Sequence, residues 1–186
     1  NKNSDVTLKN ININPTRNGL LIALEKMGAK IKISNKRIIA GEIVADLNII
    51  SSELKGCELD HEMAKLMIDE FPILSIAASQ ANSPSHFKGL NELRVKESDR
   101  LDLINRNLIN CGCYSKINDN DLFIDPTKNK KIISPEIRTD FDHRIAMSFS
   151  VLGSKIGKLH IKESDSISTS FPSFKEQFNK AGGSLS

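Results

Sequence analysis

The residue types that could carry chemistry are concentrated in residues 92–101, which read Glu-Leu-Arg-Val-Lys-Glu-Ser-Asp-Arg-Leu. Apolar residues at helical spacing follow, so this charged stretch is predicted to end where a helix begins. A helix start presents free N–H groups and the positive end of the helix dipole, which favour a phosphate or a carboxylate. We therefore expect an anion site here, with Ser98 or Asp99 as the helix cap.

Mixed charges before a helix are also typical of ordinary capping and solvation. Two further segments favour a functional interpretation. Residues 140–149 read Asp-Phe-Asp-His-Arg-Ile-Ala-Met-Ser-Phe and again place Asp, His and Arg at the start of an apolar helix. Residues 68–74 place two acidic residues before Pro72, and proline is tolerated in the first turn of a helix but not in its interior. Three helix starts thus carry ionic groups.

The composition restricts the class of protein. A chain of 186 residues, 39% of them apolar, can bury one core and is predicted to form one domain. A net charge of +3, no Trp and one Tyr make a nucleic-acid-binding surface an unfavourable interpretation. The sequence has no apolar stretch long enough to span a bilayer, so no membrane partner is expected. Because the chain does not begin with Met, we expect it to be a piece of a longer protein.

The cysteines argue against a metal or redox centre. Cys57, Cys111 and Cys113 are odd in number, and one residue separates the last two where zinc and redox sites need at least two. We expect reduced thiols in a cytoplasmic protein, with no metal and no cofactor.

Helices ending at glycine and followed by short strands form an α/β pattern. Helices are predicted at residues 14–28, 69–78, 100–109, 142–152 and 174–178. Strands are predicted at residues 31–33, 37–47, 114–117, 121–124 and 158–162, with further edges at 46–50 and 131–133. The helices that begin at residues 69 and 142 are offset by about 73 positions, which indicates an imperfect internal repeat.

Residues 93–101, Leu-Arg-Val-Lys-Glu-Ser-Asp-Arg-Leu, resemble the signature of the 5-enolpyruvylshikimate-3-phosphate synthase family. Residues 142–147 resemble its second signature and residues 69–74 its aspartate segment, in the family's order. The resemblance runs from Arg17-Asn18-Gly19 to Ser170-Phe171-Pro172. It implies an enolpyruvyl transferase-like lobe of about three βαβαββ repeats, at residues 1–50, 51–126 and 127–186, with helices packed inside. The chain resembles the C-terminal part, so the second lobe and the N-terminal segment are expected to be its missing partners.

The resemblance implies transfer of the enolpyruvyl group of phosphoenolpyruvate to the 5-hydroxyl of shikimate 3-phosphate, a step of aromatic amino-acid biosynthesis. Asp69 would bind the shikimate hydroxyls and orient the proton of the attacking one, Glu97 would be the acid and base at the methylene carbon, and Lys96 would contact the acceptor hydroxyl. Substrate anions would be bound by Arg100, His143 and Arg144. Thr169 stands where some members have a lysine that binds phosphoenolpyruvate.

Alternatives remain open at this point. Asp69 could be a helix cap, Glu97 a salt-bridge partner of Lys96 or Arg100, and His143 a structural residue. The chain could belong to a UDP-N-acetylglucosamine enolpyruvyl transferase or to a non-catalytic module that binds anions or RNA. The family builds its site between two lobes, so the isolated fragment is expected to be inactive.

Overall fold

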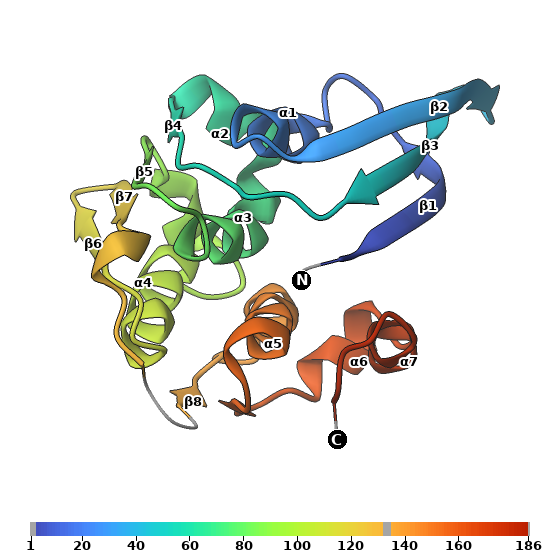
Figure 1. Cartoon of the computed structure of the whole chain (residues 1–186). Helices are drawn as coiled ribbons and strands as arrows, with labels where there is room; N and C mark the ends of the chain where they lie inside the picture. The colour runs from blue at the N-terminus through green and yellow to red at the C-terminus, as the bar shows by residue number, and fades with distance from the viewer. Residues whose placement is uncertain (1–2, 132–134, 186) are drawn as a thin grey trace.

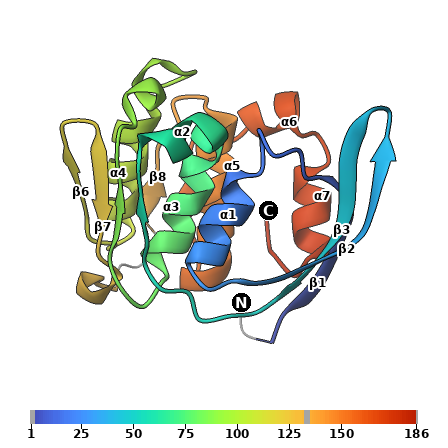
Figure 2. The same ribbon diagram turned by 90° about the horizontal axis from the view of Figure 1, so that it is seen from above.

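The computed structural model describes residues 3–131 and 135–185, and its helices lie between sheets (Figure 1; Figure 2). The α-helices are α1 (Gly19–Lys26), α2 (His61–Met67), α3 (Phe71–Ser79), α4 (Arg100–Asn110), α5 (His143–Ile156), α6 (Ser166–Ser170) and α7 (Phe174–Lys180). The 3-10 helices are η1 (Ile68–Glu70), η2 (Asn91–Val95) and η3 (Pro126–Lys128). The strands are β1 (Asp5–Asn12), β2 (Lys30–Ile39), β3 (Glu42–Ile50), β4 (Glu58–Leu59), β5 (Ser85–Phe87), β6 (Ser115–Asn118), β7 (Asp121–Ile124), β8 (Glu136–Ile137) and β9 (His160–Ile161).

Three small sheets surround the helices. One is antiparallel with the strand order β1-β3-β2, the second is mixed with the order β4-β5-β7-β6, and the third is the parallel pair β8-β9. Figure 2 shows α1, α3, α4 and α5 between the first sheet on one side and β6 and β7 on the other. This arrangement confirms the predicted α/β class with helices inside. The division into repeats at residues 50 and 126 stays a prediction.

Helix α3 occupies the centre of the core. Seven of its nine residues are buried, and it packs against α5 and α4. Pro72 lies in its first turn, as its position in the sequence indicated. Burying one large apolar side chain contributes roughly 1.5–3 kcal/mol. Among the described residues, the largest fully buried apolar side chains are Met27, Leu59, Met67, Phe71, Leu74, Phe87, Leu90, Leu93, Leu101, Ile104 and Phe149.

Aspartate side chains fix where three of the α-helices begin. The Oδ1 atom of Asp99 accepts the N–H of Asp102 at 3.0 Å, so Asp99 rather than Ser98 caps α4. Asp60 caps α2 by accepting the N–H of Met63 at 3.2 Å. Asp142 caps α5. A side-chain acceptor at this position satisfies an N–H group that has no partner within the helix.

The strand predictions for the first 50 residues were partly wrong. The predicted strand 37–47 is interrupted by a turn at Ala40 and Gly41, whose φ angles of 51° and 83° reverse the chain between β2 and β3. Residues 46–50 belong to β3, which is the central strand of its sheet and not an edge. Strand β1 was not predicted, because its asparagines and lysine interrupt the alternation of apolar residues.

The bounds of several other elements also differ from prediction. Helix α1 begins at Gly19, and residues 15–17 form a turn before it. The predicted edge at 131–133 has two of its three residues outside the described part of the chain. Within residues 3–131 and 135–185, none of the helices has both the length and the hydropathy needed to cross a membrane.

Asp46, in the central strand β3, binds a bulge in each neighbouring strand. One extra residue interrupts the register of β1 between residues 8 and 11, and another that of β2 between residues 34 and 37. Asn10 and Asn35 lie in these bulges with φ angles of 58° and 51°. The carboxylate of Asp46 accepts the side-chain amide of Asn35 at 2.9 Å, the N–H of Asn10 at 3.0 Å and Nη2 of Arg37 at 3.3 Å. These bonds lower the pKa of Asp46 from 3.8 to about 2, and the bond to Asn35 has the largest effect.

Candidate functional site

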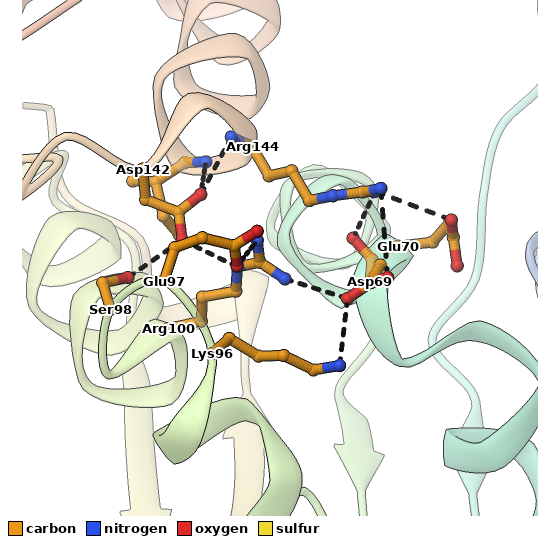
Figure 3. Close-up of polar contacts among 9 residues, drawn as sticks. Asp69, Glu70, Lys96, Glu97, Ser98, Arg100, Asp142 and Arg144 are labelled. Carbon is orange, nitrogen blue, oxygen red and sulfur yellow. Dashed lines mark hydrogen bonds and ion pairs between the residues drawn. The ribbon is translucent and has the colours of Figure 1, made fainter. Parts of the chain in front are cut away.

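The side chain of Arg100 is the centre of an ionic cluster that joins the three predicted segments (Figure 3). Its side chain is 1% exposed. Its Nε donates to Oδ2 of Asp142 at 2.7 Å, its Nη1 to Oδ1 of Asp69 at 2.9 Å, and its Nη2 to Oε2 of Glu97. A buried guanidinium is tolerated only where carboxylates compensate its charge, so the fold and the ion pairs depend on each other.

Asp142 connects the starts of α4 and α5. It is fully buried, and its Oδ1 accepts the N–H groups of Arg144 at 2.9 Å and Ile145 at 3.3 Å. Its Oδ2 accepts from Nε of Arg100 and from the hydroxyl of Ser98, the latter at 3.0 Å. One carboxylate therefore binds two segments that lie more than 40 positions apart in the sequence.

Asp69 lies in η1, immediately before α3, and several cations converge on it. Nζ of Lys96 lies 3.4 Å from its Oδ1, and Nη1 of Arg144 donates to its backbone carbonyl at 3.0 Å. Burial alone raises the pKa of Asp69, but the charges of Arg144, Lys96 and Arg100 outweigh burial and hold the pKa below its ordinary value. The alternative that Asp69 caps a helix is wrong, because Glu70 occupies the cap position of α3 and makes no side-chain cap bond.

The cluster has a buried side and a side that faces solvent. The side chains of Arg100 and Asp142 are 1% and 0% exposed, whereas that of Glu97 is 53% exposed. Lys96, Asp69 and Arg144 are between 27% and 35% exposed. The solvent side thus presents two cations for anionic ligands and three carboxylates, those of Asp69, Glu70 and Glu97, that can accept or donate protons. The predicted contact between Glu97 and Arg100 exists, and half of the Glu97 side chain remains accessible.

The cluster contains fewer cationic side chains than carboxylates. Lys96, Arg100 and Arg144 interact with four carboxylates, those of Asp69, Glu70, Glu97 and Asp142. A polyanionic ligand would therefore have to displace a carboxylate or find further cations. The described part of the chain contains no group of three or more His, Cys, Asp or Glu side chains that could hold a metal ion.

Two predicted site residues lie outside the cluster. His143 is the first residue of α5 and is half-buried, and its side chain has no hydrogen bond or ion pair to the described residues. Thr169 is exposed on α6, where its hydroxyl donates to the carbonyl of Ser166 at 2.7 Å. Their proposed ligand contacts stay predictions.

Three members of the cluster were not among the predicted site residues. The sequence places Asp142 only within the second signature, and it indicates Ser98 only as a candidate helix cap. Glu70 lies 3.6 Å from Nη1 of Arg144. A cap position is visible in a sequence, but the partner that a capping carboxylate finds in another segment is not. The local signal for Asp142 was its place directly before an apolar helix that carries an arginine.

Comparisons with known proteins agree with the geometry. The sequence model of the family described as EPSP synthase (3-phosphoshikimate 1-carboxyvinyltransferase) matches residues 2–178. The 3-phosphoshikimate 1-carboxyvinyltransferase of Paramagnetospirillum magneticum is 43% identical over 184 residues, which are 98% of this chain and 41% of that protein. That of Brucella canis is 44% identical over 173 residues, 92% of this chain and 38% of that protein. The chain thus spans about two fifths of the length of these curated relatives.

Solved structures give the same result. EPSP synthase from Acinetobacter baumannii matches with a TM-score of 0.88 at 38% identity, over 97% of this chain and 42% of that one. The enolpyruvyl transferase NikO from Streptomyces tendae matches with a TM-score of 0.69 at 13% identity, over 97% of this chain and 39% of that one, which shows a shared fold alone.

Proposed function

This chain belongs to the EPSP synthase family, and we propose that it forms the part of a 3-phosphoshikimate 1-carboxyvinyltransferase that contains the Arg100 cluster. The reaction would transfer the enolpyruvyl group of phosphoenolpyruvate to the 5-hydroxyl of shikimate 3-phosphate in the cytoplasm. The observation that carries the proposal is the convergence of Asp69, Glu97 and Asp142, one from each signature segment, on a single buried guanidinium.

The exposed side of the cluster supports specific roles. Asp69 accepts hydrogen bonds from the hydroxyls of shikimate 3-phosphate and takes the proton of the attacking 5-hydroxyl as its oxygen bonds to the central carbon of phosphoenolpyruvate. Glu97, with half of its side chain exposed, gives a proton to the methylene carbon in the addition step. In the elimination step a proton leaves that carbon for Glu97 as the carbon–oxygen bond to phosphate breaks. Lys96 lies beside Asp69 and stabilises the charge of the departing phosphate.

Arg100 and Arg144 bind the anionic groups of phosphoenolpyruvate, and His143, at the same helix start, contributes a further hydrogen bond. A guanidinium can bind a carboxylate through two parallel N–H groups. Both Nη atoms of Arg100 donate hydrogen bonds to carboxylates of the chain, Nη1 to Asp69 and Nη2 to Glu97. An incoming carboxylate therefore takes the place of one of these side chains, which releases it for proton transfer. Thr169 binds phosphate only if α6 approaches the ligand.

The excess of carboxylates over cations means that this chain alone is a weak anion site. The remaining cations would come from the part of the family's enzymes that this chain does not span. Closure of that part over Glu97 and Lys96 would also exclude water, which strengthens each charge contact several-fold. We expect the 186-residue chain alone to be inactive.

A chimaera tests the proposal. This chain replaces the matching 184 residues of the Paramagnetospirillum magneticum relative, and release of phosphate from phosphoenolpyruvate is measured with shikimate 3-phosphate as acceptor. Turnover with this acceptor, none with UDP-N-acetylglucosamine and none from the chain alone are the expected results. A folded chimaera that releases no phosphate, or one that uses the UDP-sugar, would contradict the proposal.

A further inference from the structure

We infer that Asp142 is a positioning residue that fixes Arg100 and the start of α5 relative to each other, so that the guanidinium groups of Arg100 and Arg144 act as one receptor for a ligand with two anionic groups. The inference rests on the proposed function. It concerns a side chain that is fully buried and therefore acts through its neighbours, without contacting the ligand.

The three carboxylates around Arg100 differ in exposure and in the nitrogen they bind. Asp142 binds Nε and is 0% exposed, whereas Asp69 and Glu97 bind the two Nη atoms and are 33% and 53% exposed. The Nε edge is therefore anchored within the protein, and the Nη edge faces the groups that contact solvent. Because a guanidinium is planar, fixing the Nε edge also fixes the direction of the two Nη atoms.

The carboxylate oxygen of Asp142 that does not bind Arg100, Oδ1, fixes the start of α5. Its Oδ1 accepts the N–H groups of Arg144 and Ile145, and the N–H of Asp142 itself donates to the carbonyl of the buried Thr139 at 2.9 Å. Arg144 extends from this first turn, and its Nη1 donates to the carbonyl of Asp69 at 3.0 Å. Both guanidinium groups thus reach Asp69: Arg100 binds its carboxylate, and Arg144 binds its backbone carbonyl and lies 3.9 Å from its Oδ2 (Figure 3).

Only a carboxylate satisfies all four donors around position 142. Each oxygen receives two of them: Oδ1 receives two backbone N–H groups, and Oδ2 receives Nε of Arg100 and the Ser98 hydroxyl. An asparagine would direct its NH₂ group against one of these pairs of donors. A serine is a good helix cap but supplies no charge for Arg100. Asp142→Ser therefore separates the capping role from the positioning role.

The test uses the chimaera, with Asp60→Ser as the matched control, since Asp60 caps α2 and belongs to no arginine cluster. Asp142→Ser is expected to raise the KM for phosphoenolpyruvate by at least about tenfold, which corresponds to about 1.4 kcal/mol, with a smaller change in kcat. Asp60→Ser is expected to leave both constants within twofold. A purely structural role would lower the melting temperature and the active fraction of Asp142→Ser and leave its KM unchanged, which would overturn the inference.

A second pair of variants applies if Asp142→Ser does not fold. Ser98→Ala removes one hydrogen bond to Oδ2 of Asp142 and leaves the buried charges paired. It is expected to raise the KM for phosphoenolpyruvate about two- to fivefold, as the loss of roughly 0.5–1 kcal/mol would, with the melting temperature within a few degrees of the parent. The swap Ser98→Asp with Asp142→Ser returns a carboxylate to the vicinity of Nε and is expected to recover part of the affinity. An unchanged KM in Ser98→Ala would overturn the inference.

The activity of the unmutated chimaera distinguishes a failure of the proposed function from a failure of the positioning role of Asp142. If it has no turnover, the proposed function fails, and the variants are then compared by calorimetric titration with phosphoenolpyruvate. Weaker binding by Asp142→Ser than by Asp60→Ser would still support the positioning role, and equal binding would contradict it. If the unmutated chimaera turns over and Asp142→Ser keeps the parental KM, only the positioning role fails.

Discussion

Two aspartate–arginine clusters in this chain use the same chemical groups in different surroundings. In the three-stranded sheet, Asp46 binds Arg37, whose side chain is 37% exposed, together with two asparagines of neighbouring strands. At the helix starts, Asp142 binds Arg100, whose side chain is 1% exposed and contacts two further carboxylates. The first cluster lies within one sheet, and the second joins three segments of the chain.

The difference indicates how a structural cluster can be distinguished from a functional one. Among the described residues, the side-chain partners of Asp46 all lie in its own sheet, and its ion pair is with Arg37 alone. The Arg100 cluster keeps Glu97, Lys96 and Arg144 partly accessible above a buried ion pair. Burial of the Arg100–Asp142 pair fixes the geometry of the cluster. The accessibility of Glu97, Lys96 and Arg144 permits chemistry. Variants of the two clusters test this distinction.

The largest expected effect is on turnover. In the chimaera, Glu97→Gln keeps a side chain of the same length and can still accept a hydrogen bond from Arg100, but it cannot transfer the proton. A general acid–base group contributes roughly 10²–10⁴-fold, so kcat is expected to fall by that factor. Asp46→Asn, the control from the sheet, is expected to stay within twofold. Turnover of Glu97→Gln within threefold of the parent would remove the functional distinction between the clusters.

The next effect is on stability. Arg100→Met leaves Asp142 buried without its counter-charge, and breaking such a pair costs about 3–5 kcal/mol. Arg37→Met breaks a partly exposed pair and is expected to cost less than about 1 kcal/mol. Urea unfolding of the 186-residue chain, followed by circular dichroism, measures both. Equal shifts of the two midpoints would show that burial does not distinguish the clusters.

The smallest effect is a change in acid sensitivity. Since the folded-state pKa of Asp46 is depressed to about 2, its ionised form stabilises the fold above pH 4, and this contribution is lost as the pH falls from about 4 to about 2. Asp46→Asn is therefore expected to lower the free energy of unfolding at neutral pH and to make its dependence on pH less steep in that window. Denaturation midpoints at several pH values measure the slope. Identical slopes in parent and variant would contradict the assignment of Asp46.

Sequence patterns located the helix starts well because their signals are local. Pro72, Asp99 and Asp142 each stand at the start of an apolar helix, and all three are where they were predicted. The division of residues 37–47 into two strands could not be predicted, since Ala40 adopts a left-handed φ angle that its type does not favour. The apolar residues around it read as one strand.

The predicted site residues of the three segments lie together, but the contacts between the segments were not predicted. Asp69, Lys96, Glu97, Arg100 and Arg144 lie together as expected. The choice of Asp142 as the partner of Arg100, and the burial of that pair, depend on how α4 packs beside α5. No periodicity or spacing within the chain encodes that packing. His143 and Thr169 were named as site residues only from their positions in the family pattern. In the structure both lie outside the Arg100 cluster.

The bulges that Asp46 binds also bear on self-association. Both outer strands of the first sheet present backbone N–H and C=O groups to which a strand from another molecule could add, and exposed apolar side chains such as Leu8 and Ile38 would favour that addition. An extra residue in each strand interrupts the row of groups and twists the edge. Because one carboxylate in the central strand binds both bulges, we expect this single side chain to protect both edges against strand addition.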